Sequence, residues 1–115
     1  MSEFTRVAAV EDLDPLFEAS KGKAVLLFKH SLTCPISTAA FNEYQSFLKQ
    51  RQDSDAEIYA LVEIQKARPV SAAIAERTGV RHESPQALLL RDSQVVWHAS
   101  HWSITANSLQ QAIDG

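Results

Sequence analysis

The chain has 115 residues, of which 45% are hydrophobic and 22% charged, and this composition predicts a single globular domain over residues 1–115. Its 11 basic and 14 acidic residues give a formal net charge of −3, so we expect no nucleic-acid partner. No apolar run approaches the roughly 18 residues that a membrane span needs, so we expect no membrane partner and a cytoplasmic location. The one cysteine, Cys34, excludes an intramolecular disulfide and suits a reducing compartment.

The first half of the chain predicts a strand between two helices. The acidic start of Glu11–Ser20 is typical of a helix N-terminus. The run Ala24–His30 is apolar enough to be a strand buried on both faces. After it, Pro35 suits the first turn of a helix that runs to about Gln50. The buried stripe expected on this helix consists of Ile36, Ala40, Tyr44, Phe47 and Leu48.

The second half predicts one more strand and helix, then a hairpin and a final helix. Gly79 stands where a C-terminal glycine cap would end the middle helix. The final helix is expected to begin near Ser103 or Thr105 and to end at Gly115. The other predicted elements are a strand over Glu57–Ile64, a helix over Ala67–Thr78, and an antiparallel hairpin of Gln86–Leu90 and Gln94–Ala99.

The predicted element order indicates the fold class. A short strand at Arg6–Val10 is also expected before the first helix. A strand-helix-strand unit implies a right-handed parallel crossover, whereas the late hairpin adds antiparallel strands. We therefore expect an α/β protein with a central mixed sheet of four to five strands and helices on both faces. This is the element order of a thioredoxin-like fold.

Cys34 lies where the predicted buried strand gives way to a helix N-terminus. Unpaired N–H groups and the positive end of the helix macrodipole stabilise an anion there, so the thiolate is favoured near neutral pH. Lys29 and His30 lie just upstream, and either side chain could add positive charge. The alternative is that the cysteine is a small buried hydrophobe, and its position alone leaves this open.

Ser37 occupies the place of the second, resolving cysteine of a C-x-x-C pair. Its hydroxyl could hydrogen-bond a thiolate but cannot form a disulfide with it. A lone nucleophilic thiol can attack a mixed disulfide and carry the displaced group until an external thiol releases it. We therefore expect monothiol exchange at Cys34, with Thr33 and Pro35 flanking and supporting the nucleophile.

A second feature is Ser84-Pro85, immediately before the predicted hairpin. Thioredoxin-like proteins hold a cis-proline facing the nucleophile at this place. Only about 5–6% of X–Pro bonds in folded proteins are cis, and the position in the fold is what overrides that low frequency. We expect Cys34 and Pro85 to form one site, in which the backbone at Ser84 is free to pair with an extended substrate.

With these residues in view, the sequence resembles the monothiol bacilliredoxins, the YtxJ-type family of thioredoxin-like proteins. The resemblance extends over essentially the whole domain, and the three stretches together are far more specific than any one of them. The matching stretches are FKHSLTCPIS at Phe28–Ser37, GVRHESPQALLLRD at Gly79–Asp92 and QVVWHASHWSIT at Gln94–Thr105.

The resemblance implies a cytoplasmic redox protein that removes bacillithiol from S-bacillithiolated proteins through a mixed disulfide on Cys34. Bacillithiol would be a thiol co-substrate, and no other cofactor is expected. Other bacilliredoxins or a reductase are further expected partners. Because bacillithiol carries malate carboxylates, we expect Lys29, Arg81 or His82 to contact them, with Ser84 and Pro85 completing the substrate site.

Two other classes of function remain open at this stage. Monothiol glutaredoxins, which carry iron–sulfur clusters, also have a serine three positions after the cysteine, but they have a glycine where this chain has Pro35. A non-catalytic thioredoxin-like binding module would have an unreactive sulfur. The four histidines and the cysteine do not form a four-ligand zinc pattern, so we expect no metal site.

Overall fold

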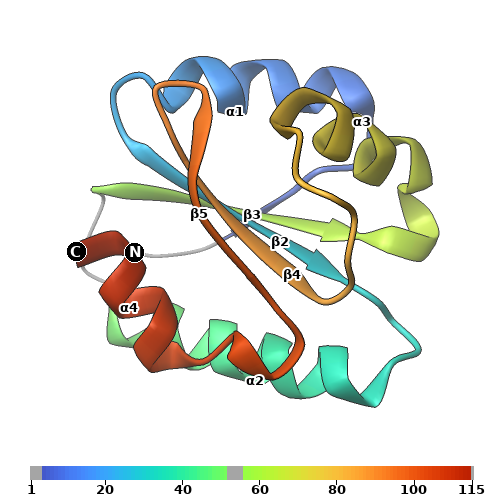
Figure 1. The fold of residues 1–115 in the computed structure, drawn as a ribbon, viewed down its shortest axis with the longest axis vertical. Coiled ribbons are helices and arrows are strands. Elements are labelled where there is room, and N and C mark those ends of the chain that lie inside the picture. Colours follow the sequence, from blue (N-terminus) through green and yellow to red (C-terminus); the bar gives the residue numbers. More distant parts are fainter. Residues whose placement is uncertain (1–3, 52–55, 115) are drawn as a thin grey trace.

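The computed structural model describes residues 4–51 and 56–114, which form one five-stranded sheet with helices on both faces (Figure 1). The strands are β1 (Phe4–Arg6), β2 (Ala24–His30), β3 (Glu57–Glu63), β4 (Gln86–Arg91) and β5 (Gln94–Ser100). The helices are α1 (Leu13–Ala19), α2 (Pro35–Gln50), α3 (Arg68–Thr78) and α4 (Ala106–Asp114), with 3₁₀ turns at Val10–Asp12, Ile64–Lys66 and His101–Ser103. The predicted mixed sheet, covered on both faces, is confirmed.

The strands lie in the order β1-β3-β2-β4-β5, with β2 parallel to β3 and antiparallel to β4. The pair β4–β5 is the expected antiparallel hairpin. Helices α1 and α3 cover one face of the sheet, and α2 and α4 cover the other (Figure 1). The carboxyl ends of β2 and β3 and the start of β4 therefore meet at one edge of the sheet, where the chain enters α2.

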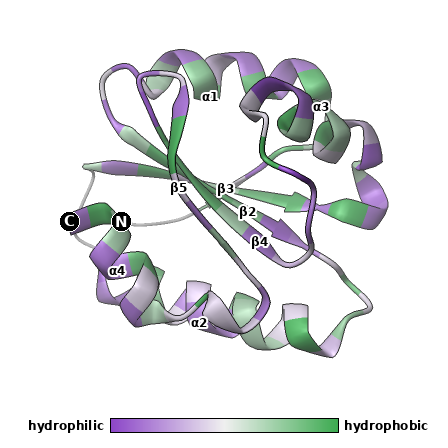
Figure 2. Cartoon of the chain, in the orientation of Figure 1, coloured by the Kyte–Doolittle hydropathy of each residue, from purple (hydrophilic) through white to green (hydrophobic). Residues whose placement is uncertain are grey.

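Strand β2 is the centre of the core, because all seven of its residues are buried. Its side chains alternate between two hydrophobic layers. Leu26 and Phe28 belong to the layer that α2 and α4 complete, whereas Val25 and Leu27 belong to the layer with α1 and α3. Figure 2 shows the central strands predominantly hydrophobic, with hydrophilic residues on the outer sides of the helices.

The N-terminal strand differs from the expectation of Arg6–Val10. Strand β1 spans Phe4–Arg6. Just after it, the Val7 N–H donates a hydrogen bond of 2.9 Å to the Leu61 carbonyl of β3. The Asp12 carboxylate then accepts hydrogen bonds from the N–H groups of Ala8 and Ala9, at 3.2 and 3.1 Å. This local acceptor turns the chain into a 3₁₀ helix, so α1 begins at Leu13 rather than at Glu11.

Two details of the later helices also differ from the sequence prediction. In α2 the buried side includes Ser37, whereas the predicted Ile36 is only half-buried. Helix α4 begins at Ala106 because Thr105 and Ser108 cap it reciprocally, each side chain accepting from the other residue's N–H at 3.0 Å. The predicted end of this helix, Gly115, lies outside the described residues.

Within the described residues, none of the helices is both long enough and apolar enough to cross a membrane.

Gly79 ends α3 with a left-handed backbone, at φ +71°. An alanine there would have open space for its Cβ but an unfavourable φ, so Gly79→Ala is expected to lower the free energy of unfolding by about 1 kcal/mol. Urea denaturation measures this. Gly22→Ala is the control, because its Cβ would meet only the Ala19 carbonyl oxygen at 3.9 Å. Equal stability of the two variants would contradict the strain argument.

Candidate active site

Cys34 is the N-terminal cap residue of α2, with an extended backbone at φ −105° and ψ 121°. Its carbonyl accepts from the Thr38 N–H at 3.0 Å, which closes the first helical turn. The residue is partly exposed, so the interpretation as a fully buried hydrophobe does not describe it. A partly exposed cysteine therefore lies at the positive end of a 16-residue helix.

Ser37 is fully buried, and its hydroxyl has two partners on the strand side of the loop. The Ser31 N–H donates to Ser37 Oγ at 2.8 Å. His30 Nδ1 shares a second hydrogen bond with the same oxygen, also at 2.8 Å. The hydroxyl that could have bonded the thiolate is thus held by groups on and after β2, and it fastens the first turn of α2 to the end of that strand.

His30 lies on the α2 side of the sheet. Its ring stacks on Phe41, with centroids 4.7 Å apart and planes 21° apart. Burial lowers the pKa of His30 below its usual value, against an opposing effect of the Glu63 charge. The uncharged ring is therefore favoured at neutral pH, and His30 acts as a hydrogen-bonding partner of Ser37 rather than as a fixed cation.

Lys29 faces the opposite layer, because neighbouring residues of a strand point to opposite faces. It is fully buried, and its Nζ has no hydrogen-bond partner among the described residues. Burial lowers the pKa of Lys29 to about 8, and the Glu83 charge opposes this effect. The two upstream basic residues therefore differ in role: His30 supports the turn of Cys34, whereas Lys29 lies on the α3 side near Glu83.

Gln65, which sequence reasoning did not single out, holds the loop that leads to Cys34. Its Oε1 accepts from the Leu32 N–H at 2.9 Å. Its Nε2 donates to Ser31 Oγ at 2.9 Å and to Thr33 Oγ1 at 3.3 Å. Gln65 follows β3, and the parallel pairing of β3 with β2 brings it to this loop. One side chain thus contacts three consecutive residues before the cysteine.

The Ser84–Pro85 peptide bond is cis. Extending the β2–β4 register by one step from the pair Lys29–Gln86 places Pro85 opposite His30. The buried Pro85 accepts from the His101 N–H through its carbonyl at 3.1 Å. No backbone hydrogen bond of Ser84 occurs among the described residues. The segment predicted to pair with substrate therefore lies at the same sheet edge as the loop of Cys34.

The remaining predicted substrate residues, Arg81 and His82, lie on the exposed connection between α3 and β4. The Arg81 carbonyl accepts from Gln86 Nε2 at 3.0 Å. Burial lowers the pKa of His82, and the positive charge of Lys29 lowers it further against the effect of Glu83. His82 is thus close enough to Lys29 for the Lys29 charge to affect its pKa, whereas Arg81 is an exposed residue.

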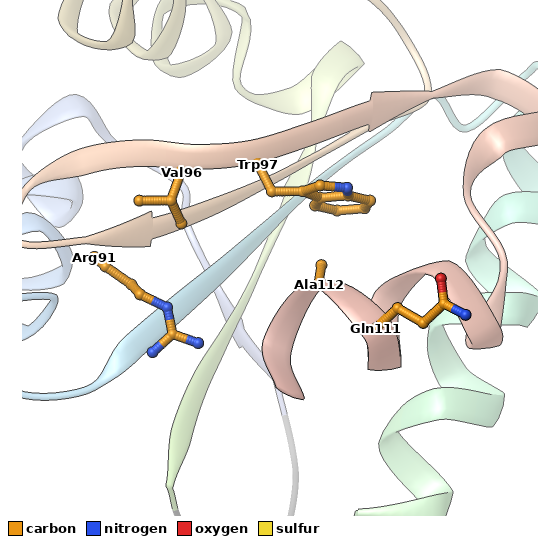
Figure 3. Close-up of a pocket in the computed structure, with 5 residues that line it drawn as sticks. All are labelled: Arg91, Val96, Trp97, Gln111 and Ala112. Atoms are coloured by element: carbon orange, nitrogen blue, oxygen red, sulfur yellow. The ribbon is translucent and has the colours of Figure 1, made fainter. Parts of the chain in front are cut away.

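Two further hollows lie outside this cluster. One, of about 260 Å³, adjoins the first half of α2 at Ala39, Ala40 and Glu43 and is also lined by His101 and Trp102, which is 69% exposed. The other, of about 530 Å³, lies between β5 and α4 (Figure 3), toward the sheet edge opposite Cys34. Its lining residues are Arg91, Val96, Trp97, Gln111 and Ala112. Among the described residues no cluster of three or more His, Cys, Asp or Glu could hold a metal ion.

Comparison with known families identifies the chain. A family model described as "Monothiol bacilliredoxin BrxC" matches residues 5–109. The chain belongs to the monothiol bacilliredoxin family. The match includes the Cys34 turn, Gln65 and the Ser84–Pro85 segment, so the whole site described above lies within the family's shared region.

Solved structures support the same assignment. A candidate oxidoreductase with a thioredoxin fold is 34% identical, with a TM-score of 0.82, and the match covers 93% of this chain and 90% of that one. Thioredoxin from Fasciola hepatica has a TM-score of 0.75 at 15% identity, covering 96% and 97%. Spinach chloroplast thioredoxin f has 0.74 at 18%, covering 98% and 85%. The fold is thioredoxin-like, and family and fold together assign a thiol redox role.

Removing the Gln65 side chain tests its hold on the loop. Gln65→Ala is expected to slow the reaction of Cys34 with 4,4′-dithiodipyridine about tenfold, because small displacements of a reacting group are costly. Gln65→Glu keeps an acceptor for the Leu32 N–H but lacks the two donors, so its rate is expected to be intermediate. The control is Gln45→Ala on the exposed side of α2. A well-folded Gln65→Ala protein that reacts at the wild-type rate would contradict the positioning role.

Lys29 predicts a pH-dependent stability. In the unfolded chain its pKa returns to 10.5, whereas in the folded protein it is about 8, so the unfolded state binds more protons between these values. The cost of the buried charge is fully present below pH 8 and disappears as pH rises toward 10.5. Lys29→Met is therefore expected to raise the free energy of unfolding at pH 7 by about 1–3 kcal/mol.

Urea denaturation at pH 7 and pH 10 measures the effect, and the gain from Lys29→Met should shrink at the higher pH. Lys23→Met, on an exposed residue close by in sequence, is the matched control and should show no such dependence. A Lys29→Met protein that is less stable than wild type at pH 7 would show that the ammonium makes a net stabilising interaction.

Proposed function

We propose that the chain removes bacillithiol from S-bacillithiolated proteins and carries it as a mixed disulfide on Cys34, in a reducing compartment such as the cytoplasm. The observation that carries the proposal is the position of Cys34, a partly exposed cysteine at the N-terminus of a long helix. The thiol redox role of the family supplies the reaction class. Bacillithiol is the thiol co-substrate, and the mechanism requires no other cofactor.

The chemistry needs one sulfur from the chain in each step. The Cys34 thiolate attacks the bacillithiol sulfur of the client's mixed disulfide, forms a new S–S bond and releases the client thiolate, which takes up a proton. The client cysteine is thereby reduced. A second, external thiol then attacks the bacillithiol sulfur on Cys34, which releases the Cys34 thiolate and leaves bacillithiol in a disulfide with that external thiol.

Ser37 explains why the second thiol must come from outside. Its oxygen stands where a resolving sulfur would stand, and it is committed to Ser31 and His30 at 2.8 Å each. The hydroxyl cannot form a disulfide, and its partners hold it in the protein interior. The structure therefore supports a carrier that hands bacillithiol to another thiol, another bacilliredoxin or a reductase.

Client proteins have two features to contact beside the sulfur. The Ser84 backbone at the cis-proline offers groups for pairing with an extended segment. The exposed Trp102 and the hollow that it shares with His101 lie on the flank of Pro85, because the His101 N–H donates to the Pro85 carbonyl. An aromatic side chain of this kind suits a protein interface.

The decisive experiment is intact mass spectrometry of the reduced protein after incubation with bacillithiol disulfide. We expect one bacillithiol adduct per chain near pH 7, released by added free thiol. Cys34→Ala is expected to form no adduct, which is a complete loss because it removes the only sulfur able to exchange. A bacillithiolated client incubated with reduced protein should lose its adduct while Cys34 gains it.

Matched controls separate exchange from incidental labelling. Ser37→Ala keeps the nucleophile and should still form the adduct, whereas a client whose cysteine is absent should transfer nothing. No adduct on the wild-type protein near neutral pH would overturn the exchange function and favour a binding module. A visible absorption band in protein purified without oxygen would favour iron–sulfur carriage instead.

A further inference from the structure

Buried polar atoms without a hydrogen-bond partner occur at the end of β2, on α3 and around the start of β4. Among the residues that the structure describes, the buried side-chain atoms without a hydrogen-bond partner are Lys29 Nζ, Ser71 Oγ, Ser84 Oγ and Gln86 Oε1. Lys29 and Gln86 are opposite each other in the β2–β4 register, and Ser84 is two residues before Gln86. Buried polar groups normally have partners, so each of these atoms needs a physical explanation.

A hollow of about 280 Å³, which Ser71 lines, lies between the N-terminal half of α3 and the α3–β4 connection. We name it the α3 hollow. It is lined by Ile64, Arg68, Ser71, Ala72 and His82. Ser71, one of these lining residues, is only 5% exposed, and its hydroxyl has no hydrogen-bond partner among the described residues. Arg68 is exposed at the first position of the 11-residue helix α3, whose N-terminus adds a positive partial charge.

The charges around the α3 hollow favour an anion. Arg68, an exposed residue of the lining, carries a guanidinium, and His82, whose pKa is lowered by burial, offers one ring N–H donor in its uncharged form. Lys29 is close enough to His82 to lower its pKa, and its own pKa of about 8 keeps the ammonium protonated at neutral pH. Glu83 is the acidic group facing Lys29 and His82, and it offsets part of this positive charge without forming a hydrogen bond to Lys29 Nζ.

We propose that the α3 hollow binds a carboxylate of the small-molecule thiol exchanged at Cys34, with Arg68, Ser71 and His82 as its contacts and Lys29 as a buried charge beside them. This inference rests on the proposed function. It assigns Arg68 and Ser71, which no sequence pattern indicated, and it leaves Arg81 outside, because Arg81 does not line the hollow.

The position of the hollow links it to the sulfur. Ile64, in its wall, precedes Gln65, which holds the loop of Cys34. His82 precedes the Ser84–Pro85 segment at the same sheet edge. A carboxylate a few bonds from a sulfur bound at Cys34 therefore has a recess on the α3 side whose polar lining residues are Arg68, Ser71 and His82, whereas the Trp102 hollow on the α2 side remains for a client protein.

The test uses two disulfides that differ only in charge: the disulfide of 3-mercaptopropionate and the disulfide of 3-mercaptopropionamide. The measured quantity is the ratio of their rates of mixed-disulfide formation on Cys34, followed by intact mass. The acid-to-amide rate ratio of the wild type is expected to be about ten times that of the double variant Arg68→Gln/His82→Asn. This factor corresponds to the loss of one charge-assisted hydrogen bond. Lys29→Met alone should lower the ratio in the same direction.

Two charge-matched controls separate a site from general attraction. Arg77→Gln lies on α3 but pairs with Asp14 at 2.7 Å, away from the hollow, and Arg81→Gln lies on the same connection as His82 but outside the lining. Both should leave the ratio unchanged. A ratio that is the same in wild type and in Arg68→Gln/His82→Asn, or that falls equally with Arg81→Gln, would overturn the subsite. Wild-type protein that reacts with neither disulfide would instead overturn the proposed exchange function.

Discussion

The double-sided burial of β2 is the constraint from which the site follows. A strand that contacts helices on both faces has no freedom of register, since a shift of one residue would exchange its two side-chain sets. All seven residues of β2 are buried, and its pairing with β3 on one side and β4 on the other is fixed over almost its whole length. Its end at His30 is therefore a rigid point, and Cys34 is four residues beyond it.

Polar side chains near His30 fix the orientation of the loop that carries Cys34. Because side chains alternate along β2, His30 lies in the α2 layer and Lys29 lies in the α3 layer. The two faces of the sheet therefore differ chemically at this end of the strand. On the first, Ser37 joins His30 and the Ser31 backbone in a buried hydrogen-bond cluster. Leaving such buried groups without hydrogen bonds costs about 1–3 kcal/mol each. The hydrogen bonds of Ser37 therefore hold the first turn of α2 against the strand. Gln65 adds the matching hold from β3.

Much of this arrangement could be predicted from the sequence, because it depends on short, local patterns. The apolar run of β2, Pro35 at the start of α2 and the Ser84-Pro85 pair before β4 each have a direct backbone consequence, and the structure places all three at one edge. Gln65, Arg68 and Ser71 carry no such signal. They are ordinary polar residues in sequence, and their roles arise only from the parallel crossover that brings the region after β3 beside the loop after β2. The side of the sheet that Lys29 faces follows from register in the same way.

Lys29 also shows that this edge of the sheet is not arranged for stability alone. A fully buried ammonium without a hydrogen bond to another described residue disfavours its own charged form, which is why burial lowers its pKa to about 8. A methionine of similar length would fill the same space without that cost. Val25 and Leu27, which lie in the same layer, are apolar, so packing of the fold requires no charged residue at position 29. Glu83 faces this ammonium without a hydrogen bond to it, and the anion site proposed for the α3 hollow would bring a second negative charge close to it during the reaction.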